Sequence, residues 1–502
     1  VEFTVYFPED HCKVHILVYG LNMQDYEELM RLRQDIYQFR GYLQQHQLTY
    51  SVAHALMALD RKLSRVHLEK LVLLFDVFEG INGSQLKIQN QTWVNYLHGL
   101  TPNRIDDLYH HYRIEPISMD PWRKGFTGGS DDHAGLFIGR TYTEAKAASI
   151  TEYLEAIRNK RSTAGGEHST FRDLSSSILK VGFETARRQP IRGFNSALAH
   201  QVASHIFEGT TVSFTTALQS KGLKLYNHFR PDPIIGLASR LVDRFLEEDF
   251  SNPDTRSQQL YDCLTDISDN AICQAINSNF SNKAGEYPQN LLQELKSPLA
   301  GLILSLPFFT SLGFMNASRH LVNDFGFDGQ INRKCASLNK RILWFSDNTT
   351  VSDLVNGLYD PDITFVTINP YQQIARDKQI LLPIIGKLSV GKAEEDFIPI
   401  PSLLRSLDQL ANLQPDEIII STTGPVGLIG LLLAKLLKTP SIGIPQEDLL
   451  TWQLQTLKNP QASEWVEKYV RWFFTQVNQV IDTQPDFMIS NPNYQPEYQL
   501  LN

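Results

Sequence analysis

Residues 69–81, EKLVLLFDVFEGI, decide the fold class of the first third of the chain. The segment is apolar and rich in strand-forming residues, and residues 14–21, VHILVYGL, form a second run of the same kind. Residues 25–47 and 150–160 instead place apolar side chains at helical spacing. This alternation of strand and helix is typical of an α/β domain with a mostly parallel sheet or a barrel.

The rest of the chain changes character twice. Between residues 173 and 335 apolar residues recur with helical spacing and β-branched clusters are rare, which predicts an all-helical connecting domain. From about residue 340, short strands return in RILWFS, ITFVTI and DEIIIS, together with an apolar helix, LIGLLLAKLL. That combination favours a doubly wound sheet of Rossmann type. We therefore predict three domains, at residues 1–172, 173–335 and 336–502.

Length, charge and cysteine usage limit the class of protein. A chain of 502 residues is too long for a single hydrophobic core, and 42% hydrophobic with 20% charged residues is ordinary for a globular protein. The formal net charge of -9, without a basic cluster, argues against nucleic acid as a partner. Four scattered cysteines indicate reduced thiols and a cytoplasmic location. The oligomeric state is left open.

One apolar stretch calls for a membrane test. Residues 298–318 carry no charge and are about long enough to span a bilayer. Pro307 stands at the centre of the stretch, and Ser, Thr, Gly and Asn interrupt it. We therefore predict a buried helix, a turn and a second buried helix. A transmembrane span is the alternative, and peripheral membrane contact is left open.

Metal-competent side chains occur in four separate segments of the N-terminal domain. Glu2 opens a strand, His15 lies in the next strand, His54 follows a helix, and Asp131 and His133 stand in GGSDDHAG. Carboxylates and imidazoles together suit Zn, Mn or Fe. On an extended segment, alternate side chains share a face, so the D-x-H pair is expected to serve neighbouring metals. Taken singly, His15 is more often a satisfied or surface imidazole, Glu2 a solvated carboxylate and His54 a helix cap; only the joint pattern favours a metal site.

The order of these motifs resembles the PHP phosphoesterase family. That family carries G-x-E-x-T, H-I-L near Y-G, A-H-P and G-S-D-x-H, and this chain has VEFT, KVHILVYG, VAHA and GGSDDHAG over residues 1 to about 145. The resemblance implies a distorted (β/α) barrel that holds two or three divalent metals at the carboxyl ends of its strands. It also implies that Glu2, His15, His54, Asp131 and His133 are the metal ligands.

The match departs from the family in two places. The opening H-x-H pair, with a further Asp and His, would precede Glu2, and Ala55 stands where the family usually has proline. We therefore expect that the chain begins inside the domain, binds metal poorly and hydrolyses slowly. A longer parent protein would be the competent phosphatase.

The C-terminal part offers a glycine-rich turn. Gly424, Gly427 and Gly430 stand in STTGPVGLIGLLLAKLL, between a strand and a helix, but Val426 breaks the dinucleotide fingerprint G-x-G-x-x-G. Such glycines permit close backbone approach, and the helix N-terminus can accept an anionic group. Packing of small residues at a strand–helix turn is the equal alternative.

Residues 340 to about 490 resemble the N-terminal domain of GT-B glycosyltransferases. FSDN followed by VNG is similar to the opening strand and glycine loop of that family, and the G-P-x-G turn is similar to its next unit. The resemblance implies that Asn356, Gly357, Gly424 and Gly427 contact the substrate, a phosphorylated small molecule or nucleotide sugar. The family's second domain has no counterpart here, and residues 444–448 lack its active-site histidine.

Together these patterns predict a metal-dependent phosphoesterase fused to the first half of a glycosyltransferase. The cofactor would be a divalent ion, Mn, Zn or Fe, and activity in this stretch of chain would be impaired. The alternative is an inactive scaffold or binding protein that keeps both folds without turnover. A glycosyltransferase with a decorative N-terminal domain is the third hypothesis.

Overall fold

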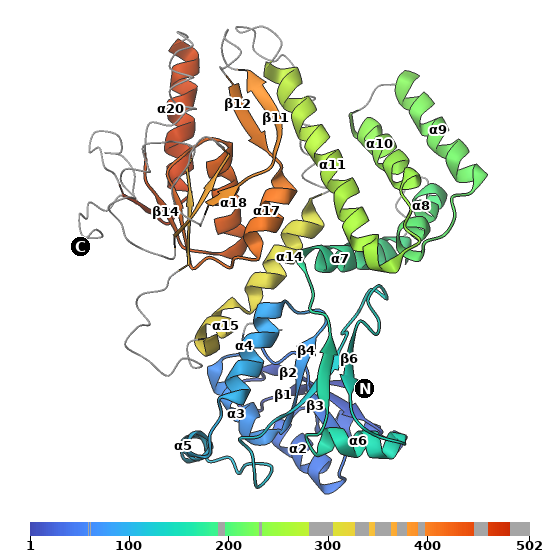
Figure 1. The fold of residues 1–502 in the computed structure, drawn as a ribbon, viewed down its shortest axis with the longest axis vertical. Helices are drawn as coiled ribbons and strands as arrows, with labels where there is room; N and C mark the ends of the chain where they lie inside the picture. Colours follow the sequence, from blue (N-terminus) through green and yellow to red (C-terminus); the bar gives the residue numbers. More distant parts are fainter. Residues whose placement is uncertain are drawn as a thin grey trace. The chain divides into compact units, whose positions relative to one another are not determined.

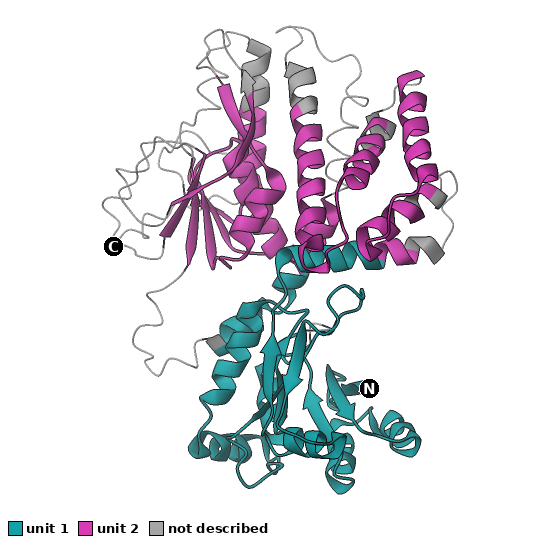
Figure 2. Cartoon of the chain, turned by 45° about the vertical axis from the view of Figure 1, so that its right-hand side comes forward, with its two compact units in different colours: residues 1–181, 314–336 teal, residues 182–313, 337–502 magenta. Residues whose placement is uncertain are grey.

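The computed structural model divides the chain into two compact units (Figure 2). Unit 1 contains residues 1–181 and 314–336, and unit 2 contains residues 182–313 and 337–502. The structure describes residues 1–58, 60, 62–188, 196–229, 233–280, 305–326, 341–346, 363–368, 379–389, 397–445 and 460–481. These units differ from the three predicted domains. Residues 182–313 of the predicted helical domain belong to unit 2 with the C-terminal sheet, and residues 314–336 belong to unit 1.

Unit 1 is built on a five-stranded mixed sheet of order β1-β2-β3-β4-β5 (Figure 1). Its strands are β1 (Glu2–Tyr6), β2 (Lys13–Tyr19), β3 (Thr49–Val52), β4 (Val77–Asn82) and β5 (Gly125–Gly129). The β1–β2 and β2–β3 pairs are antiparallel, whereas the β3–β4 and β4–β5 pairs are parallel. The predicted mostly parallel arrangement therefore applies only to the second half of this sheet.

Helices and a hairpin complete unit 1. They are α1 (Met23–Leu32), α2 (Ile36–Gln45), α3 (Arg65–Leu74), α4 (Lys87–His98), α5 (Pro102–Tyr112), α6 (Ile150–Arg158), α15 (Arg319–Gly326) and the antiparallel pair β6 (Thr141–Glu144) and β7 (Thr163–Gly166). The segment predicted as one helical stretch, 25–47, is two helices, because Asp35 caps a new N-terminus by accepting from the amides of Tyr37 and Gln38. Helix α15 packs Phe325 against the ring of Trp93, with ring centroids 5.6 Å apart.

The core of unit 1 follows from alternation along its strands. In β1 and β2 every second side chain is buried, including Phe3, Val5, Ile16 and Val18, each at most 2% exposed. Since successive side chains of a strand point to opposite faces, the intervening polar residues must gather on the other face. The N-terminal strands therefore present one face to the core and carry Glu2, Thr4 and His15 on the other.

Among its described residues, the predicted helical region contains helices joined by connecting segments and no strand. Its helices are α7 (Phe171–Arg188), α8 (Ser196–Glu208), α9 (Phe214–Phe229), α10 (Pro233–Glu247), α11 (Pro253–Phe280) and α14 (Leu306–Ala317). Within the described residues, no helix is both long enough and apolar enough to cross a membrane. Pro307 lies in the first turn of α14, where its missing N–H costs nothing, and residues 298–304 of the predicted helix–turn–helix lie outside the described residues.

Unit 2 contains a parallel six-stranded sheet of order β10-β9-β8-β13-β14-β15. The strands are β8 (Ile342–Phe345), β9 (Ile363–Thr367), β10 (Gln379–Leu381), β13 (Glu417–Ile420), β14 (Ser441–Gly443) and β15 (Gln479–Val480). Numbered along the chain, this is the order 3-2-1-4-5-6 of doubly wound sheets. The antiparallel pair β11 (Ile384–Ser389) and β12 (Phe397–Pro401) and the helices α17 (Leu403–Ala411), α18 (Pro425–Leu437) and α20 (Pro460–Thr475) complete the unit.

Glycines let α18 lie close to the sheet. A Cβ on Gly427 would stand 1.8 Å from the carbonyl oxygen of Thr422, and a Cβ on Gly430 would meet the ring of Phe345 at 2.7 Å. Both contacts are shorter than any real Cβ contact allows. The glycine spacing that suggested a binding loop is thus required for packing between β13 and the helix that follows it.

We expect Gly427→Ala to destabilise unit 2 by about 1–3 kcal/mol, because the added methyl group must displace backbone. Gly222→Ala in α9 is the control, since a Cβ there meets nothing within 4 Å and the change should stabilise by about 0.5–1 kcal/mol. Urea unfolding followed by circular dichroism measures both midpoints. Equal midpoints for the two variants would refute this account of the turn.

Candidate metal centre

The pairing of β1 with β2 brings Glu2 and His15 onto one face of the sheet. In this antiparallel register Glu2 is opposite Leu17, and Thr4 is opposite His15. Glu2 and His15 are therefore diagonal neighbours on the same face, close enough for long side chains to touch. Glu2 Oε1 lies 2.5 Å from His15 Nδ1.

His54 joins this pair from the end of β3. The N–H of the preceding residue, Ala53, donates to the carbonyl of His15 at 3.0 Å, which ties the segment to β2. His54 itself has φ of +26°, a strained conformation for a residue with a side chain. Its N–H donates to Glu79 Oε2 at 2.8 Å, and its carbonyl accepts from Met57 at 2.8 Å. Strain held by surrounding contacts in this way is typical of functional sites.

Three ligand atoms converge as a result. His54 Nε2 lies 3.3 Å from Glu2 Oε1 and 3.1 Å from His15 Nδ1. Ligands bound at about 2.0–2.1 Å around a tetrahedral Zn ion lie roughly 3.3 Å apart. Two of the three separations match that value, and the Glu2–His15 contact would have to lengthen. Glu2, His15 and His54 form the one group of three or more metal-competent side chains found among the described residues.

The second ring nitrogen of His15 is also held. Thr4 Oγ1 lies 3.2 Å from His15 Nε2, within hydrogen-bonding distance. A partner on the far nitrogen fixes the orientation of the imidazole and is the usual companion of a metal-ligating histidine. Thr4 is the threonine of the E-x-T pattern in VEFT, but it was not among the predicted site residues.

Electrostatics at the triad favour opposite charges on its members. The hydrogen bond from His15, followed by that from His54, holds the pKa of Glu2 well below its usual range, although burial opposes the shift. For His54, burial lowers the pKa, but the hydrogen bond to Glu2 and the charges of Asp131 and Glu79 outweigh it, so that its pKa is raised. Negative charge therefore dominates around the triad.

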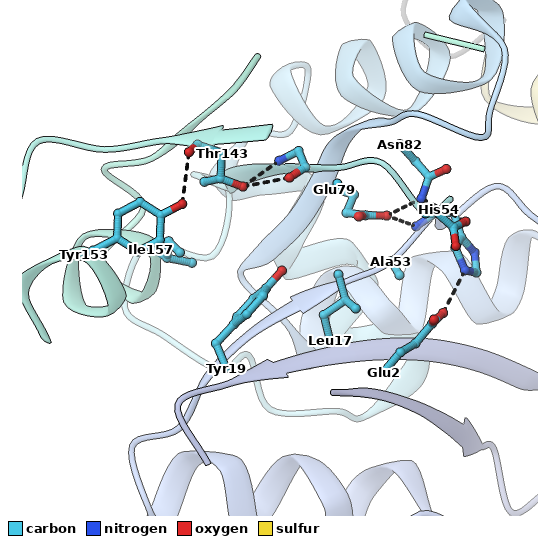
Figure 3. A pocket seen from close by; sticks show the side chains of 13 residues that line it. Glu2, Leu17, Tyr19, Ala53, His54, Glu79, Asn82, Thr143, Tyr153 and Ile157 are labelled. Carbon is cyan, nitrogen blue, oxygen red and sulfur yellow. Dashed lines mark hydrogen bonds and ion pairs between the residues drawn. The ribbon is translucent and has the colours of Figure 1, made fainter. Parts of the chain in front are cut away.

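Two members of the triad, Glu2 and His54, line a pocket of about 350 Å³ (Figure 3). The residues that line it are Glu2, Leu17, Tyr19, Ala53, His54, Glu79, Asn82, Gly128, Gly129, Asp131, Thr143, Tyr153 and Ile157. Three of these carry carboxylates, and none of the described lining residues is a lysine or arginine. Such a pocket attracts a cation, because His54 is the one described lining residue that can become positively charged, and it must be neutral to bind a metal.

Glu79 and Asn82 connect the backbone of His54 to Asp131 in the loop after β5. Asn82 Nδ2 donates to Glu79 Oε2 at 2.8 Å and to Asp131 Oδ2 at 3.2 Å. Ser84 Oγ also donates to Asp131 Oδ2, at 2.8 Å. Burial raises the pKa of Glu79 to about 7. Sequence reasoning missed Glu79 and Asn82; the available signal was a carboxylate inside the apolar run VFEGIN, which needs polar partners when buried.

The loop after β5 does not place Asp131 and His133 as expected. Asp131 lines the pocket but is not part of the triad, and the side chain of His133 is 77% exposed. The segment is not extended, because Asp131 has φ of +46°. Asp132 then accepts from the amides of Ala134 and Phe137, at 2.8 and 2.6 Å, and folds the loop into a turn. The extended backbone assumed for the D-x-H pair is therefore absent, although His133 Nδ1 still lies 3.5 Å from Asp131 Oδ1.

The strand ends also differ from the implied arrangement. His54 and Asp131 follow the carboxyl ends of β3 and β5, but Glu2 begins β1 and His15 lies within β2. The candidate centre is thus formed largely on the face of an antiparallel pair. Parallel strand ends contribute only part of it.

The candidate residues of the C-terminal part belong to unit 2. Asn356 and Gly357 are outside the described residues. Gly424 is the N-cap residue of α18, and its N–H donates to Thr422 Oγ1 at 3.2 Å. Gly427 lies inside α18 against the backbone of Thr422, which gives it a packing role. The turn follows β13, next to β8, where a doubly wound sheet reverses its strand order and binds ligands.

Comparison with known proteins gives no relative for either unit. No protein-family model, no curated protein and no solved structure matches the chain. The geometry and charge of the described residues are therefore the grounds on which a function is assigned below.

We expect His15→Ala to weaken Mn or Zn binding at least 100-fold. Loss of an outer-shell partner alone costs about 10–100-fold in affinity, and His15 supplies a ligand atom. His133→Ala is the matched control, and its affinity should stay within about twofold of the wild type because this exposed side chain is outside the triad. Isothermal titration calorimetry on the chelator-stripped chain gives the three dissociation constants. Equal constants would remove the triad from consideration.

Proposed function

We propose that unit 1 is a PHP-type, metal-dependent phosphoric ester hydrolase. Glu2, His15 and His54 would hold the divalent ion, which is Mn, Zn or Fe by the chemistry of a mixed carboxylate–imidazole set. The observation that carries the proposal is the convergence of three ligand atoms at the mouth of a pocket with an excess of carboxylates.

A metal held by three protein ligands supplies Lewis acidity and lowers the pKa of bound water. The protein's own contribution is orientation. Thr4 fixes the ring of His15, and Glu79 fixes the backbone of His54. Asp131, held by Asn82 and Ser84, would accept a proton from water or from a substrate hydroxyl.

For unit 2 we propose a nucleotide-sugar or sugar-phosphate binding function, of the kind found in the N-terminal half of GT-B glycosyltransferases. The strand order 3-2-1-4-5-6 supports it, since ligands of such sheets bind where the order reverses. Ser421, Thr422 and Thr423 provide polar groups there, at the carboxyl end of β13. The whole chain would then join hydrolysis of a phosphorylated molecule to recognition of a phosphorylated sugar.

A cytoplasmic location is part of the same proposal. Cys12, Cys263 and Cys273 are free thiols, which is the usual state of cysteine in a reducing compartment. Burial raises the pKa of Cys12 and of Cys263 to about 12, so these thiols are unreactive and serve packing.

The hydrolase proposal predicts that the chelator-stripped chain gains p-nitrophenyl phosphate hydrolysis when Mn or Zn is restored. Glu2→Gln should lower kcat/KM at least 100-fold, because it removes the anionic ligand of the triad. Glu28→Gln is the control: it changes a carboxylate of α1 that pairs only with Arg31 in the described structure and should have no effect. Metal binding without turnover of any phosphoester would leave the inactive-scaffold hypothesis.

The unit 2 proposal predicts stabilisation by a nucleotide sugar. At a UDP-glucose concentration about tenfold above its dissociation constant, binding adds roughly 1.4 kcal/mol of stability. The thermal midpoint of the unit 2 transition should then rise by about 2–4 °C. Differential scanning calorimetry resolves the two transitions, and glucose alone serves as the control ligand. An unchanged midpoint up to millimolar UDP-glucose would contradict this half of the proposal.

A further inference from the structure

The pocket of unit 1 has two chemically different ends. Figure 3 shows Glu2, His54 and Asn82 at one end and Tyr153 with Ile157 at the other. Glu79 belongs to the polar end through its hydrogen bonds to the backbone of His54 and to Asn82. The polar end accounts for metal and phosphate, but it gives no reason for the apolar end.

Strand β2 connects the two ends. His15, Leu17 and Tyr19 alternate along it and therefore share one face of the sheet. At about 3.3 Å per residue, His15 and Tyr19 stand roughly 13 Å apart along the strand. A ligand group held at His15 can thus extend across Leu17 to the ring of Tyr19.

Helix α6 supplies the far wall. Tyr153 and Ile157 are four residues apart and lie on the same side of the helix. The hydroxyl of Tyr153 donates to the carbonyl of Thr143 at 3.0 Å, which fixes the ring and satisfies its polar atom. Burial raises the pKa of Tyr19, so this residue also stays neutral. The wall is therefore a rigid, uncharged, largely aromatic surface.

Charge limits what else the pocket can accept. Glu2, Glu79 and Asp131 line it, and none of its described lining residues is a lysine or arginine; His54, the one lining histidine, is engaged in binding the metal. One phosphate group can be neutralised by the metal, but a second phosphate or a carboxylate on the ligand would meet these carboxylates without a counter-charge. The volume of about 350 Å³ is at the lower end of the range for small-molecule sites.

We infer that the substrate of unit 1 is a phosphoric monoester of a small alcohol bearing an apolar, ring-sized group. This inference rests on the proposed hydrolase function. The phosphate lies at Glu2, His15 and His54, and the organic group lies against Leu17, Tyr19 and Tyr153. Hydrolysis forms a P–O bond to water and breaks the P–O bond to the alcohol, which leaves carrying a proton, so no oxidant or reductant is needed. Nucleoside triphosphates and bisphosphorylated sugars are poor substrates.

The direct test compares benzylphosphonate with methylphosphonate, since neither can be hydrolysed. Isothermal titration calorimetry on the Mn-loaded full chain should show at least tenfold tighter binding of benzylphosphonate, because only its ring reaches the apolar wall. Tyr153→Ala should reduce that preference at least fivefold while leaving methylphosphonate binding unchanged. Tyr226→Ala, an exposed tyrosine of α9 in unit 2, is the control and should change neither. Equal binding of both phosphonates by the wild type would overturn the inference.

Turnover separates this inference from the function on which it rests. Benzyl and ethyl phosphate both release a primary alcohol, so their difference reports recognition of the organic group. A tenfold higher kcat/KM for benzyl phosphate supports both proposals. Equal kcat/KM values with clear turnover overturn the substrate class and leave the hydrolase standing. A phosphonate preference without any turnover supports the pocket assignment and overturns the hydrolase.

Discussion

The register between β1 and β2 is the constraint on which the candidate centre depends. It places Phe3, Val5 and Ile16 in the core, and by the same alternation it places Glu2 and His15 together on the opposite face. A slip of one residue would bring the acid and the imidazole into the core and expose the aromatic side chains. Burial of the apolar face therefore fixes the geometry of the polar one. The site needs no separate mechanism to bring its first two ligands together.

Glu79 extends this constraint across the sheet. Its carboxylate accepts from the backbone of His54 and from the side chain of Asn82, and Asn82 in turn donates to Asp131. A buried carboxylate is costly unless its hydrogen bonds are satisfied. The segments that carry His54, Glu79 and Asp131 are therefore held in one arrangement, and a change in any of them would break these hydrogen bonds together. The strained backbone of His54 is tolerated for the same reason. Glu79 thus links metal affinity to the local stability of unit 1, although it belongs neither to the triad nor to the loop after β5.

Much of the fold follows from periodicity in the sequence. The apolar, strand-forming run 14–21 and the apolar helix 428–437 predict β2 and α18 correctly, because buried segments leave a clear hydrophobic pattern. The candidate site is less predictable. Side-chain type suggests Glu2, His15 and His54, but their convergence depends on strand pairing between distant segments. Asp131 misleads because a left-handed backbone conformation leaves no trace in residue spacing, and Glu79 is hidden within a strand that is otherwise apolar.

The same glycine-rich pattern has different causes in the two units. In unit 2, Gly427 is required because the helix backbone passes against the carbonyl of Thr422, so its spacing reports packing. In unit 1, Gly129 lies beside the carboxylate of Glu79: a Cβ there would come within 2.5 Å of Glu79 Oε1. Any larger residue at position 129 would push Glu79 away from the pocket and break its hold on His54. A glycine therefore indicates a binding site only when the atom that would clash with its Cβ belongs to that site. Gly129 meets this condition, because the atom is Oε1 of Glu79, whose carboxylate holds the backbone of His54.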